Sequence, residues 1–532
     1  MRGRIVRAAA AVPVEPLGPG PRGSRVQVVD YDATADRYYG PFVLAEDDPF
    51  ADSDDEELLT NPGFHSQNVY AIVSRTLAQF EAALGRRVPW SFQSHQLQAA
   101  PHAFSEANAF YSRRDHALLF GYFPGRDGRR VFTSLSHDIV AHEATHAILD
   151  GLRERYMTPS SPDQAAFHEA CSDIVAILAV FATPGVVRSL LGNGRASLPR
   201  SSVSVAALRR SALLGLAEEM GAELSAVRGA LRRSASLTPS KRYLKEWLDP
   251  HTRGEVLVAA VLQAFLEVWT QRLRSLGEVR PGEISTERVV EEGETAARHL
   301  LTMTIRALDY TPPVDLLFGD YLSALLTADA RVSPDDGKYN YRGILRESFA
   351  GYGIEPVSQP EGSGTWEPVE GSFRYDRIGF EHLQRDPTEA FRFLWDNREA
   401  LKMYEDAFCR VMAVKPTLRV GPDGFLVRET LAEYYQVLDL RASDLRRLDI
   451  RKPATMPDDT VVTLYGGGVL LFNDYGQLAY HIRNRITNAE RQSERLAYLW
   501  ENGYFGRRPL RRFAELHRNR ALQQTSGFQE GW

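Results

Sequence analysis

The stretch Asp138–His146, which reads DIVAHEATH, decides how the chain is interpreted. Residues four apart on a helix project about 40° from one another and lie ~6 Å apart along the axis, so His142 and His146 share one face. Two imidazoles placed in this way can bind one metal ion. Glu143 is rotated off that face, where its carboxylate can reach a water molecule beside the metal without binding the metal itself. The stretch therefore predicts a metal-binding helix with its N-cap at Ser136.

A second stretch, Phe167–Asp173 (FHEACSD), supplies the ligand that two imidazoles leave missing. Glu169 stands 23 positions after His146 (169 − 146), an interval that suits a helix end, a loop and an antiparallel return. Glu169 can therefore complete a set of two histidines and one glutamate, with the fourth position open for water. Asp173, four residues further along, is expected to accept the outer N–H of a ligand histidine.

Two neighbours of Glu169 are expected to have structural roles. His168 should support a ligand or the fold, because a fourth protein ligand would close a catalytic site. Cys171 should turn away from Glu169 and Asp173 on the helix, as a small buried residue. The alternative for the whole group is two core histidines with a solvated pair of acidic residues. We favour the metal, because ionisable groups without partners are costly in helices as apolar as these.

Composition narrows the class of protein. The chain has 532 residues, 43% hydrophobic and 25% charged, which is the balance of a soluble globular protein with two or more domains. The formal net charge is −6 and no long basic block occurs, so we expect no nucleic-acid partner. Two cysteines exclude a disulfide framework and fit a reducing compartment. We recognise no signal sequence and no apolar window of bilayer length, and therefore predict a cytoplasmic protein without membrane contact.

Patterning along the chain predicts an α+β protein in several parts. In the N-terminal part, a helix from Ser66 to Gly85 is expected to precede a small antiparallel sheet. Near the C-terminus, Gly466–Gly468 is expected to form a hairpin turn between two strands. The parts are an N-terminal arm (1–62), an N-terminal lobe (63–160), a helical lobe (161–355), a linker rich in Gly, Ser, Pro and Glu (356–371), and an α+β C-terminal domain of unknown role (372–532).

The remaining elements are predicted from the same patterns. Asp163 is expected to cap the helix that carries Glu169. Apolar spacing predicts helices over 136–155, 163–181, 204–233, 254–275, 286–308, 315–329 and 340–350. β-prone runs predict strands at Val26–Val29, Val88–Phe92, Ala107–Ser112, Leu118–Phe123, Val131–Ser134, Thr417–Val420, Val461–Tyr465 and Val469–Phe472.

Taken together, the ligand residues resemble the metal site of the thermolysin-like gluzincins, a family of zinc peptidases. The likeness covers about residues 65–350 and extends beyond the ligands. Glu106–Tyr111 (EANAFY) resembles the edge strand that binds substrate in that family, which implies that Asn108 and Ala109 contact the substrate backbone. The resemblance also implies a thermolysin-like catalytic unit of two lobes, a β-containing N-lobe and a helical C-lobe.

The segment Pro250–Gly254 (PHTRG), which opens a long apolar helix, resembles the family segment whose histidine stabilises an oxyanion. By that match His251 is a catalytic donor, and Asp249 orients it. Tyr156 falls near the position of the family's second oxyanion donor, although the loop differs in length by one residue; a structural aromatic is the alternative. Ile139, three residues before the first ligand histidine, is expected to line an apolar pocket beside the scissile bond.

Three departures from the family shape the remaining expectations. The segment after Asp173 lacks the acidic run of the family's calcium cluster, so we predict no calcium there, with Asp138 as the one counterpart left. Only about 65 residues precede the matched region, where secreted members have a signal sequence and a long propeptide. The part beyond the linker has no counterpart that we identify, and a protein partner is one role open to it.

The resemblance thus implies a zinc-dependent peptidase with one Zn²⁺ held by His142, His146 and Glu169. Glu143 is its expected general base, and a peptide or protein is its expected substrate. A catalytically silent zinc-bearing binding or regulatory protein, descended from a peptidase, is the first alternative. A zinc hydrolase of a non-peptide amide or ester is the second, because the same chemistry serves all of these bonds.

Overall fold

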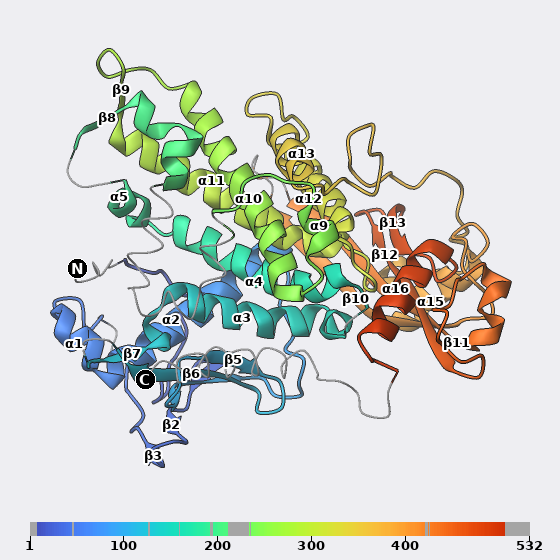
Figure 1. The fold of residues 1–532 in the computed structure, drawn as a ribbon, viewed down its shortest axis with the longest axis horizontal. Helices are drawn as coiled ribbons and strands as arrows, with labels where there is room; N and C mark the ends of the chain where they lie inside the picture. The colour runs from blue at the N-terminus through green and yellow to red at the C-terminus, as the bar shows by residue number, and fades with distance from the viewer. Residues whose placement is uncertain are drawn as a thin grey trace.

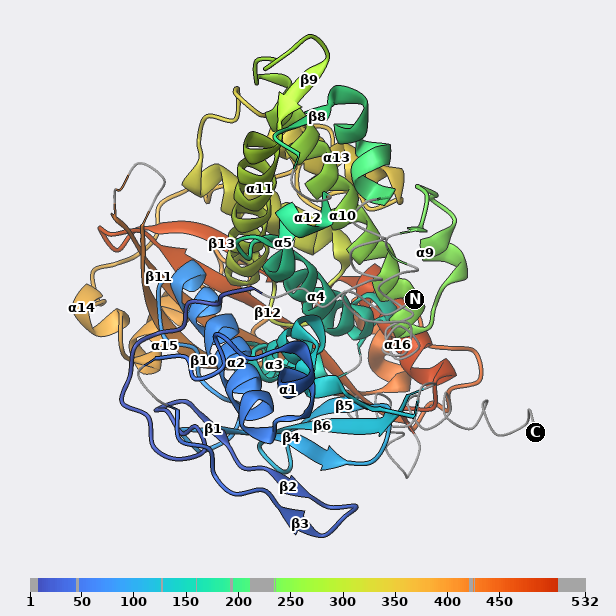
Figure 2. The same ribbon diagram turned by 90° about the vertical axis from the view of Figure 1, so that its left-hand side faces the viewer.

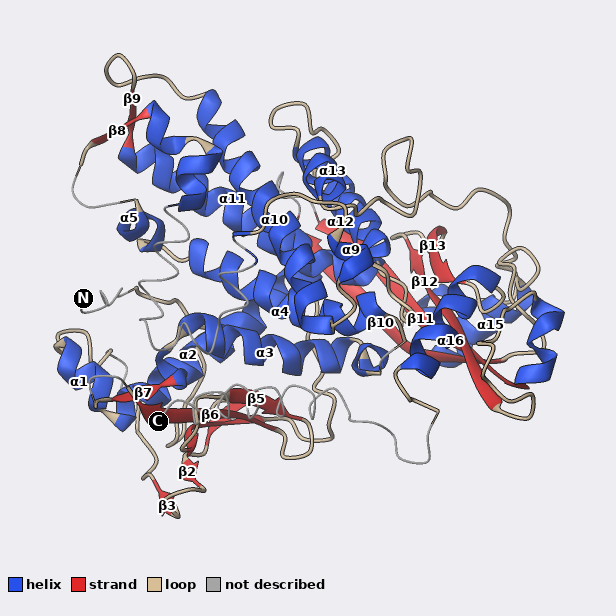
Figure 3. Cartoon of the chain, in the orientation of Figure 1, coloured by secondary structure: helices blue, strands red, loops and turns tan. Residues whose placement is uncertain are grey.

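The computed structural model describes residues 8–44, 47–125, 128–158, 160–191, 195–210, 234, 236–420, 424 and 426–505. Within them helices and strands are both extensive and lie mostly in separate regions, so the chain is an α+β protein, as predicted. Figure 1 shows one sheet low in the view, a body of helices above it and a second sheet to the right, and Figure 3 separates helices from strands by colour. The helix expected over 204–233 lies for the most part outside the described residues.

The first sheet is mixed, whereas the sequence predicted an antiparallel one. Its strands are β1 (Val26–Val28), β4 (Leu97–Phe104), β5 (Ala109–Ser112), β6 (Ala117–Pro124) and β7 (Arg130–Phe132). The order is β1-β4-β6-β5, with β7 paired to β6. β1 runs parallel to β4 and β4 to β6, whereas β5 and β7 run antiparallel to β6. A parallel pair needs a crossover connection, and a long helix provides the one between β1 and β4.

Near this sheet, one predicted strand is wrong and one strand was not predicted. Val88–Phe92 forms no strand; it is a loop in which the rings of Trp90 and Phe92 stack. The strand that the sequence analysis missed is β4, which lies between β1 and β6 and is buried along most of its length, with α2 and β2 packed against it. A strand covered on both faces shows no alternation of polar and apolar residues. Pro101 adds to the difficulty, since proline within a run normally argues against a central strand.

The crossover helix is α2 (Pro62–Leu84). It begins at Asn61, whose side chain accepts a hydrogen bond from the backbone N–H of Gly63, and Pro62 occupies the first turn. It ends at Gly85, which has a φ of 67°, as the sequence predicted for the C-terminal stop. The N-terminal arm adds α1 (Asp55–Thr60) and a hairpin of β2 (Tyr31–Asp32) and β3 (Arg37–Tyr38).

Two consecutive helices carry the predicted metal ligands. They are α3 (His137–Leu152) and α4 (Pro162–Phe181), joined through a short 3-10 turn (Glu154–Met157). Ser161 caps α4 in place of Asp163, because its side chain accepts from the backbone N–H of Gln164. Asp163 instead accepts hydrogen bonds from Arg253 and from the backbone of Phe318, so it ties α4 to two later helices.

The helical lobe packs around α4. Its helices are α5 (Val186–Leu190), α9 (Tyr243–Glu246), α10 (Pro250–Arg274), α11 (Thr286–Ala307), α12 (Phe318–Val332) and α13 (Tyr341–Gly351), with a short pair of strands, β8 (Ser197–Pro199) and β9 (Glu283–Ser285). Figures 1 and 2 both show α4 between α3 and α10. Gly254 permits the close approach of α10, since a Cβ there would lie 3.1 Å from the Ala166 carbonyl oxygen. The bounds of α10, α11, α12 and α13 agree to within a few residues with the four helices predicted from residue 254 onward, which are thus confirmed.

By length and composition alone, α4 and α10 are apolar enough to cross a membrane, whereas the sequence analysis recognised no apolar window of bilayer length. The apolar window of α4 is completely buried inside the protein and that of α10 is 72% buried. A core helix of a soluble protein passes the same test, so this is weak support for a membrane span.

The second sheet is antiparallel, in the order β10-β11-β12-β13. Its strands are β10 (Phe408–Val420), β11 (Leu426–Arg441), β12 (Val461–Phe472) and β13 (Leu478–Asn484), and the helices beside it are α14 (Phe380–Leu383), α15 (Pro387–Asp396) and α16 (Ala489–Glu501). The hairpin turn predicted at Gly466–Gly468 is wrong, because the three glycines lie within β12 and pair with β11. Side chains are excluded there: a Cβ on Gly466 would lie 2.5 Å from the backbone nitrogen of Ile486. Glycine in a strand here marks close backbone approach rather than a turn.

Mostly buried charges join the second sheet to the N-terminal and helical lobes. This ionic junction consists of Arg86, Arg153, Asp309, Arg331, Lys415, Arg419, Glu429 and Glu433. Arg86 lies 2.6 Å from Asp309, which also pairs with Arg419, and Arg419 lies 2.7 Å from Glu429. Although burial raises the pKa of Asp309, the two guanidinium groups hold it well below its usual range. Apolar residues of the sheet, such as Leu431, continue the core of the helical lobe.

Candidate metal centre

Two histidines of α3 meet at their ring nitrogens. His142 and His146 are four residues apart on one face of the helix, and their Nε2 atoms lie 2.9 Å from each other. Their rings are nearly perpendicular, at 87°. This is the arrangement that the spacing of the sequence predicted.

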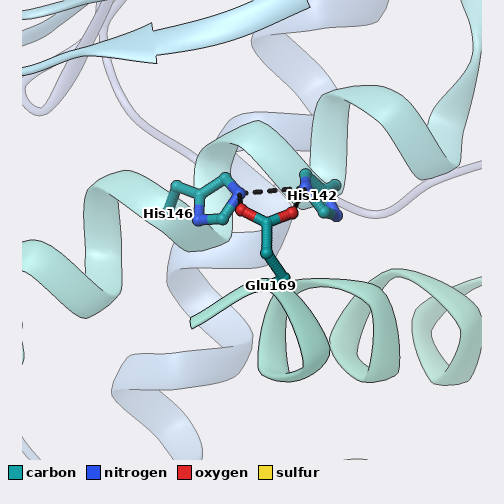
Figure 4. Close-up of side chains that lie close together, drawn as sticks. All are labelled: His142, His146 and Glu169. Atoms are coloured by element: carbon teal, nitrogen blue, oxygen red, sulfur yellow. Dashed lines mark hydrogen bonds and ion pairs between the residues drawn. The ribbon is translucent and has the colours of Figure 1, made fainter. Parts of the chain in front are cut away.

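A carboxylate from α4 faces both histidines. Glu169 has one oxygen 3.5 Å from His146 Nε2 and the other 3.8 Å from His142 Nε2. Figure 4 shows the Glu169 side chain rising from α4 toward the gap between the two rings. One ligand atom from each of the three residues lies within 4.8 Å of the others, so the group could hold a metal ion. The antiparallel return from α3 to α4 brings these residues together as expected.

A contact at the outer nitrogen of His142 fixes the orientation and the tautomer of its ring. Its Nδ1 lies 2.7 Å from Asp173 Oδ1, the contact expected from the spacing of Glu169 and Asp173 on α4. An ionised carboxylate only accepts, so Nδ1 must carry the proton. In a neutral ring the lone pair is then on Nε2, pointing at His146 and Glu169.

His146 is held by two residues of α4. Its Nδ1 lies 2.6 Å from His168 Nδ1 and 3.2 Å from the hydroxyl of Ser172. His168 is fully buried, and its ring stacks on that of His146 at 4.8 Å. His168 therefore contacts the ligand on the side away from Glu169, which agrees with the supporting role predicted for it rather than with a fourth ligand.

The donor set suits a cation. With protons on the outer nitrogens, two Nε2 lone pairs and a carboxylate converge on one region, and such groups repel one another unless positive charge lies between them. All three side chains are buried, with 3–6% of each residue exposed, so solvent screens that repulsion poorly. Nitrogen and oxygen donors of this kind are ligands of divalent transition metals.

Glu143 connects α3 to the edge of the first sheet. Its Oε2 accepts a hydrogen bond of 3.0 Å from the backbone N–H of Tyr111 in β5. The carbonyl of Asn108 accepts from Gly121 of β6, so by the alternation of an antiparallel pair the backbone groups of Ala109 and Tyr111 point away from β6. Among the described strands β5 is a terminal strand, and the edge it turns outward is the one that Glu143 contacts.

Of the two residues expected to meet a substrate backbone, Ala109 lies on that outward edge of β5. The side chain of Asn108 accepts from the backbone N–H of Ala109 at 2.8 Å, which stiffens the start of the strand. Ile139 is 3% exposed and belongs to the main apolar core. The structure thus puts Ile139 in the packing under α3, one turn before His142.

His251 joins the group from the first turn of α10. Its Nδ1 lies 3.5 Å from Glu169 Oε2, and its side chain is 17% exposed, more than those of the three ligand candidates. Asp249 was expected to orient this ring. Instead its carboxylate accepts from the backbone N–H of Thr252 at 3.1 Å and caps α10, so it positions His251 only through the helix end.

Tyr156 is not placed as an oxyanion donor. Its hydroxyl donates to the carbonyl of Pro312 at 2.7 Å and lies 2.9 Å from the Thr311 hydroxyl, and the residue is 1% exposed. The phenol therefore holds the end of the helical lobe in place, which is the structural role that the sequence analysis gave as the alternative for Tyr156.

Cys171 is buried on α4. Burial raises the pKa of its thiol to about 12, in keeping with the buried, unreactive role predicted for it.

Two contributors to the site were missed by the sequence analysis. Asp150 accepts hydrogen bonds from the hydroxyls of Ser91 and Tyr111, and so anchors β5 to α3. Ser172 contacts His146 through its hydroxyl. Helical spacing could have identified Asp150, because it lies four residues after His146.

Comparison of the chain with models of known protein families gives no match, and comparison with curated proteins gives none either.

Proposed function

We propose that the chain is a zinc-dependent peptidase whose ion is held by His142, His146 and Glu169. The observation that carries the proposal is the convergence of two imidazole nitrogens and one carboxylate within 4.8 Å. A set of two histidines and one glutamate is the protein ligand set of hydrolytic zinc sites that keep one position open. When bound, zinc supplies a Lewis acid for the substrate carbonyl and lowers the pKa of water.

Glu143 is the general base in this proposal. It shares α3 with both histidines but is rotated away from them, and the Tyr111 N–H holds its carboxylate beside β5. Its carboxylate takes a proton from the attacking water and returns it to the leaving amine. General acid–base catalysis of this kind contributes roughly 10²–10⁴-fold in rate.

Substrate positioning is assigned to β5 and His251. An extended peptide can add to the outward edge of β5 if it replaces the Asn108 side chain and the Glu143 carboxylate as acceptors of the Ala109 and Tyr111 N–H groups, which brings its scissile bond alongside Glu143. His251, at the start of α10, would donate from its ring to the oxygen that becomes negative. Loss of one such donor costs about 3–4 kcal/mol of transition-state stabilisation.

The architecture we propose is a thermolysin-like catalytic unit of two lobes. The mixed sheet with α2 and α3 corresponds to the N-lobe, and the helices from α4 to α13 correspond to the C-lobe. The order of elements supports this: a substrate-edge strand, a helix with both histidines and a helix with the glutamate follow one another along the chain.

A second candidate follows from the burial of the site. His142, Glu143, His146 and Glu169 are each no more than 6% exposed, so a peptide reaches them only after some part of the chain moves. This burial favours the catalytically silent zinc-bearing binding protein over a peptidase open at all times. Hydrolysis of a non-peptide amide or ester has no separate structural support.

Metal analysis with a cleavage screen tests the proposal. The purified full chain should contain one zinc per molecule and cleave members of a random peptide library, and a chelator should abolish cleavage. Glu143→Gln should keep the zinc and lose at least 10²-fold in kcat/KM. Glu154→Gln, an exposed glutamate just after α3, is the matched control and should retain full activity.

The outcomes separate the candidates. Stoichiometric zinc with no cleavage of any peptide contradicts the peptidase and supports the binding protein. Cleavage that survives in Glu143→Gln contradicts the role of that residue. A chain without stoichiometric metal, or with iron in place of zinc, contradicts the proposal as a whole.

A further inference from the structure

A pocket of about 400 Å³ lies away from the metal centre, where the second sheet meets the helical lobe. It opens between the first turn of α12, the segment 357–366, the end of β13 and the start of α16. The residues that line it include three arginines, two asparagines and a tryptophan: Arg483, Arg485, Arg491, Asn484, Asn488 and Trp366. None of them takes part in the site proposed for peptide hydrolysis.

The pocket lining is positively charged. Against the three arginines stands one carboxylate, that of Asp320, which gives the lining a formal charge of +2 (3 − 1). Asp320 is already bound by Arg491 through two hydrogen bonds of 2.8 and 2.9 Å. The excess charge therefore belongs to Arg483 and Arg485.

These two arginines lie next to each other at the end of β13. Arg483 uses Nη1 to donate to the carbonyl of Leu401 and to contact His481, both of which are uncharged acceptors. Over the part of the chain that the structure describes, neither Arg483 nor Arg485 forms an ion pair with a carboxylate. Burial lowers the pKa of Arg483; Tyr434 opposes this shift, and the neighbouring charge of Arg485 adds to it, as expected for two cations in one pocket.

The rest of the lining complements an anion with an apolar part. The pocket includes the N-terminus of α16, a helix of 13 residues, where Asn488 caps the first turn and the backbone dipole favours negative charge. Trp366 provides an aromatic wall and is held in place by a hydrogen bond of 2.8 Å from its Nε1 to the Tyr310 carbonyl. Planar guanidinium groups bind phosphate and carboxylate through paired hydrogen bonds.

We propose that this pocket binds a small organic anion, with its phosphate or carboxylate group on Arg483 and Arg485 and its apolar part against Trp366. Such a ligand removes the repulsion between the two guanidinium groups, and a volume of about 400 Å³ lies within the range of small-molecule sites. The proposal stands apart from the peptidase function, because it uses a different cavity and different residues.

Calorimetric titration of the full chain tests this site. The ligands are adenosine monophosphate, inorganic phosphate and succinate, which distinguish an aromatic phosphate, phosphate alone and a carboxylate. We expect saturable binding of one equivalent of at least one of them. Arg485→Gln, a change at an exposed side chain, should weaken it at least tenfold, and Arg485→Lys should weaken it less because the charge remains.

Two controls make the result specific. Arg428→Gln removes an exposed arginine from β11 of the same sheet and should leave the affinity unchanged. The titrations are repeated after chelation, because phosphate and carboxylates also bind zinc, and the affinity should persist. No saturable binding, equal weakening in Arg428→Gln and Arg485→Gln, or loss of binding on chelation would each overturn the proposal.

Discussion

Among the described residues, two of the close contacts between buried histidines differ in what lies around the rings. In the metal centre, His142 and His146 face each other through Nε2 atoms 2.9 Å apart. In the N-terminal lobe, His65 Nδ1 lies 2.7 Å from His102 Nε2. This second pair, with Asp30 at one end and the Leu59 carbonyl at the other, forms a line of hydrogen bonds that we call the histidine relay.

Counting protons shows how the relay is neutralised. It has three gaps, and both of its ends, the Asp30 carboxylate and the Leu59 carbonyl, only accept, so three N–H groups are needed. Two neutral imidazoles supply two, and therefore one ring carries an extra proton. Burial first, and then the charge of His102, lower the pKa of His65 to about 3, so the extra proton is not on His65.

The metal centre cannot be completed in the same way. Asp173 ends a line at His142 Nδ1, as Asp30 does in the relay, but a second carboxylate, that of Glu169, faces both Nε2 atoms, 3.5 Å from His146 and 3.8 Å from His142. A single proton bridges one pair of atoms, whereas a divalent cation interacts with all of them at once. The comparison teaches that a carboxylate facing both rings, more than the closeness of the rings, distinguishes a candidate metal site from a proton-filled pair.

In the ionic junction, buried carboxylates are neutralised by arginine and lysine side chains rather than by a proton or a metal ion. A substitution there gives the largest effect that we expect on the free energy of unfolding. Arg419→Ala leaves Asp309 and Glu429 buried with fewer partners, since Arg419 contacts both. Breaking a buried ion pair from one side costs about 3–5 kcal/mol. Urea denaturation should show that loss in the free energy of unfolding, with zinc content unchanged.

Arg428→Ala is the control for the junction, because Arg428 is exposed on the same sheet. Its effect on the free energy of unfolding should stay within about 0.5 kcal/mol. If Arg419→Ala costs no more than Arg428→Ala, the junction does not hold the second sheet to the helical lobe.

Asp173→Ala gives a smaller effect and separates the two histidine pairs. Without the carboxylate at Nδ1, His142 loses the contact that fixes its orientation and tautomer. Removing such a partner typically lowers metal affinity 10–100-fold, or about 1.4–2.8 kcal/mol. Competition with a fluorescent zinc chelator measures it. His65→Gln should leave the zinc affinity unchanged, and equal affinity in wild type and Asp173→Ala would contradict a metal between the rings.

The arrangement of the candidate metal centre could be predicted from sequence because its geometry is local. Within one helix, a separation of four residues fixes the relation of His142 to His146 and of Glu169 to Asp173. Only one further condition, the antiparallel return from α3 to α4, had to be correct. The short connection between the two helices leaves little room for another arrangement.

The relay and the sheets were beyond such reasoning because their contacts are distant in sequence. Asp30 and His102 are 72 residues apart and meet only because β1 and β4 pair in parallel, an arrangement that the sequence analysis did not predict. The misplaced hairpin at Gly466–Gly468 has a related cause. Glycine is used there because the chain around Ile486 lies against β12, and this neighbour cannot be read from the local pattern.

The pH dependence of stability gives the smallest effect and tests the relay directly. The folded state keeps His65 neutral down to a pKa of about 3, whereas an unfolded histidine takes up a proton near pH 6.5. The unfolded state therefore binds more protons in this window, and the free energy of unfolding falls as the pH is lowered, by about 1 kcal/mol between pH 6.5 and 5.5.

In His65→Gln, whose amide can still accept from His102 and donate to the Leu59 carbonyl, this contribution should disappear. Other groups, such as His137 with its pKa lowered to about 4 by burial, act in both proteins and cancel in the difference. Urea denaturation at several pH values should thus give a steeper loss for the wild type, and parallel curves would show that the ring in the relay is protonated together with its neighbour.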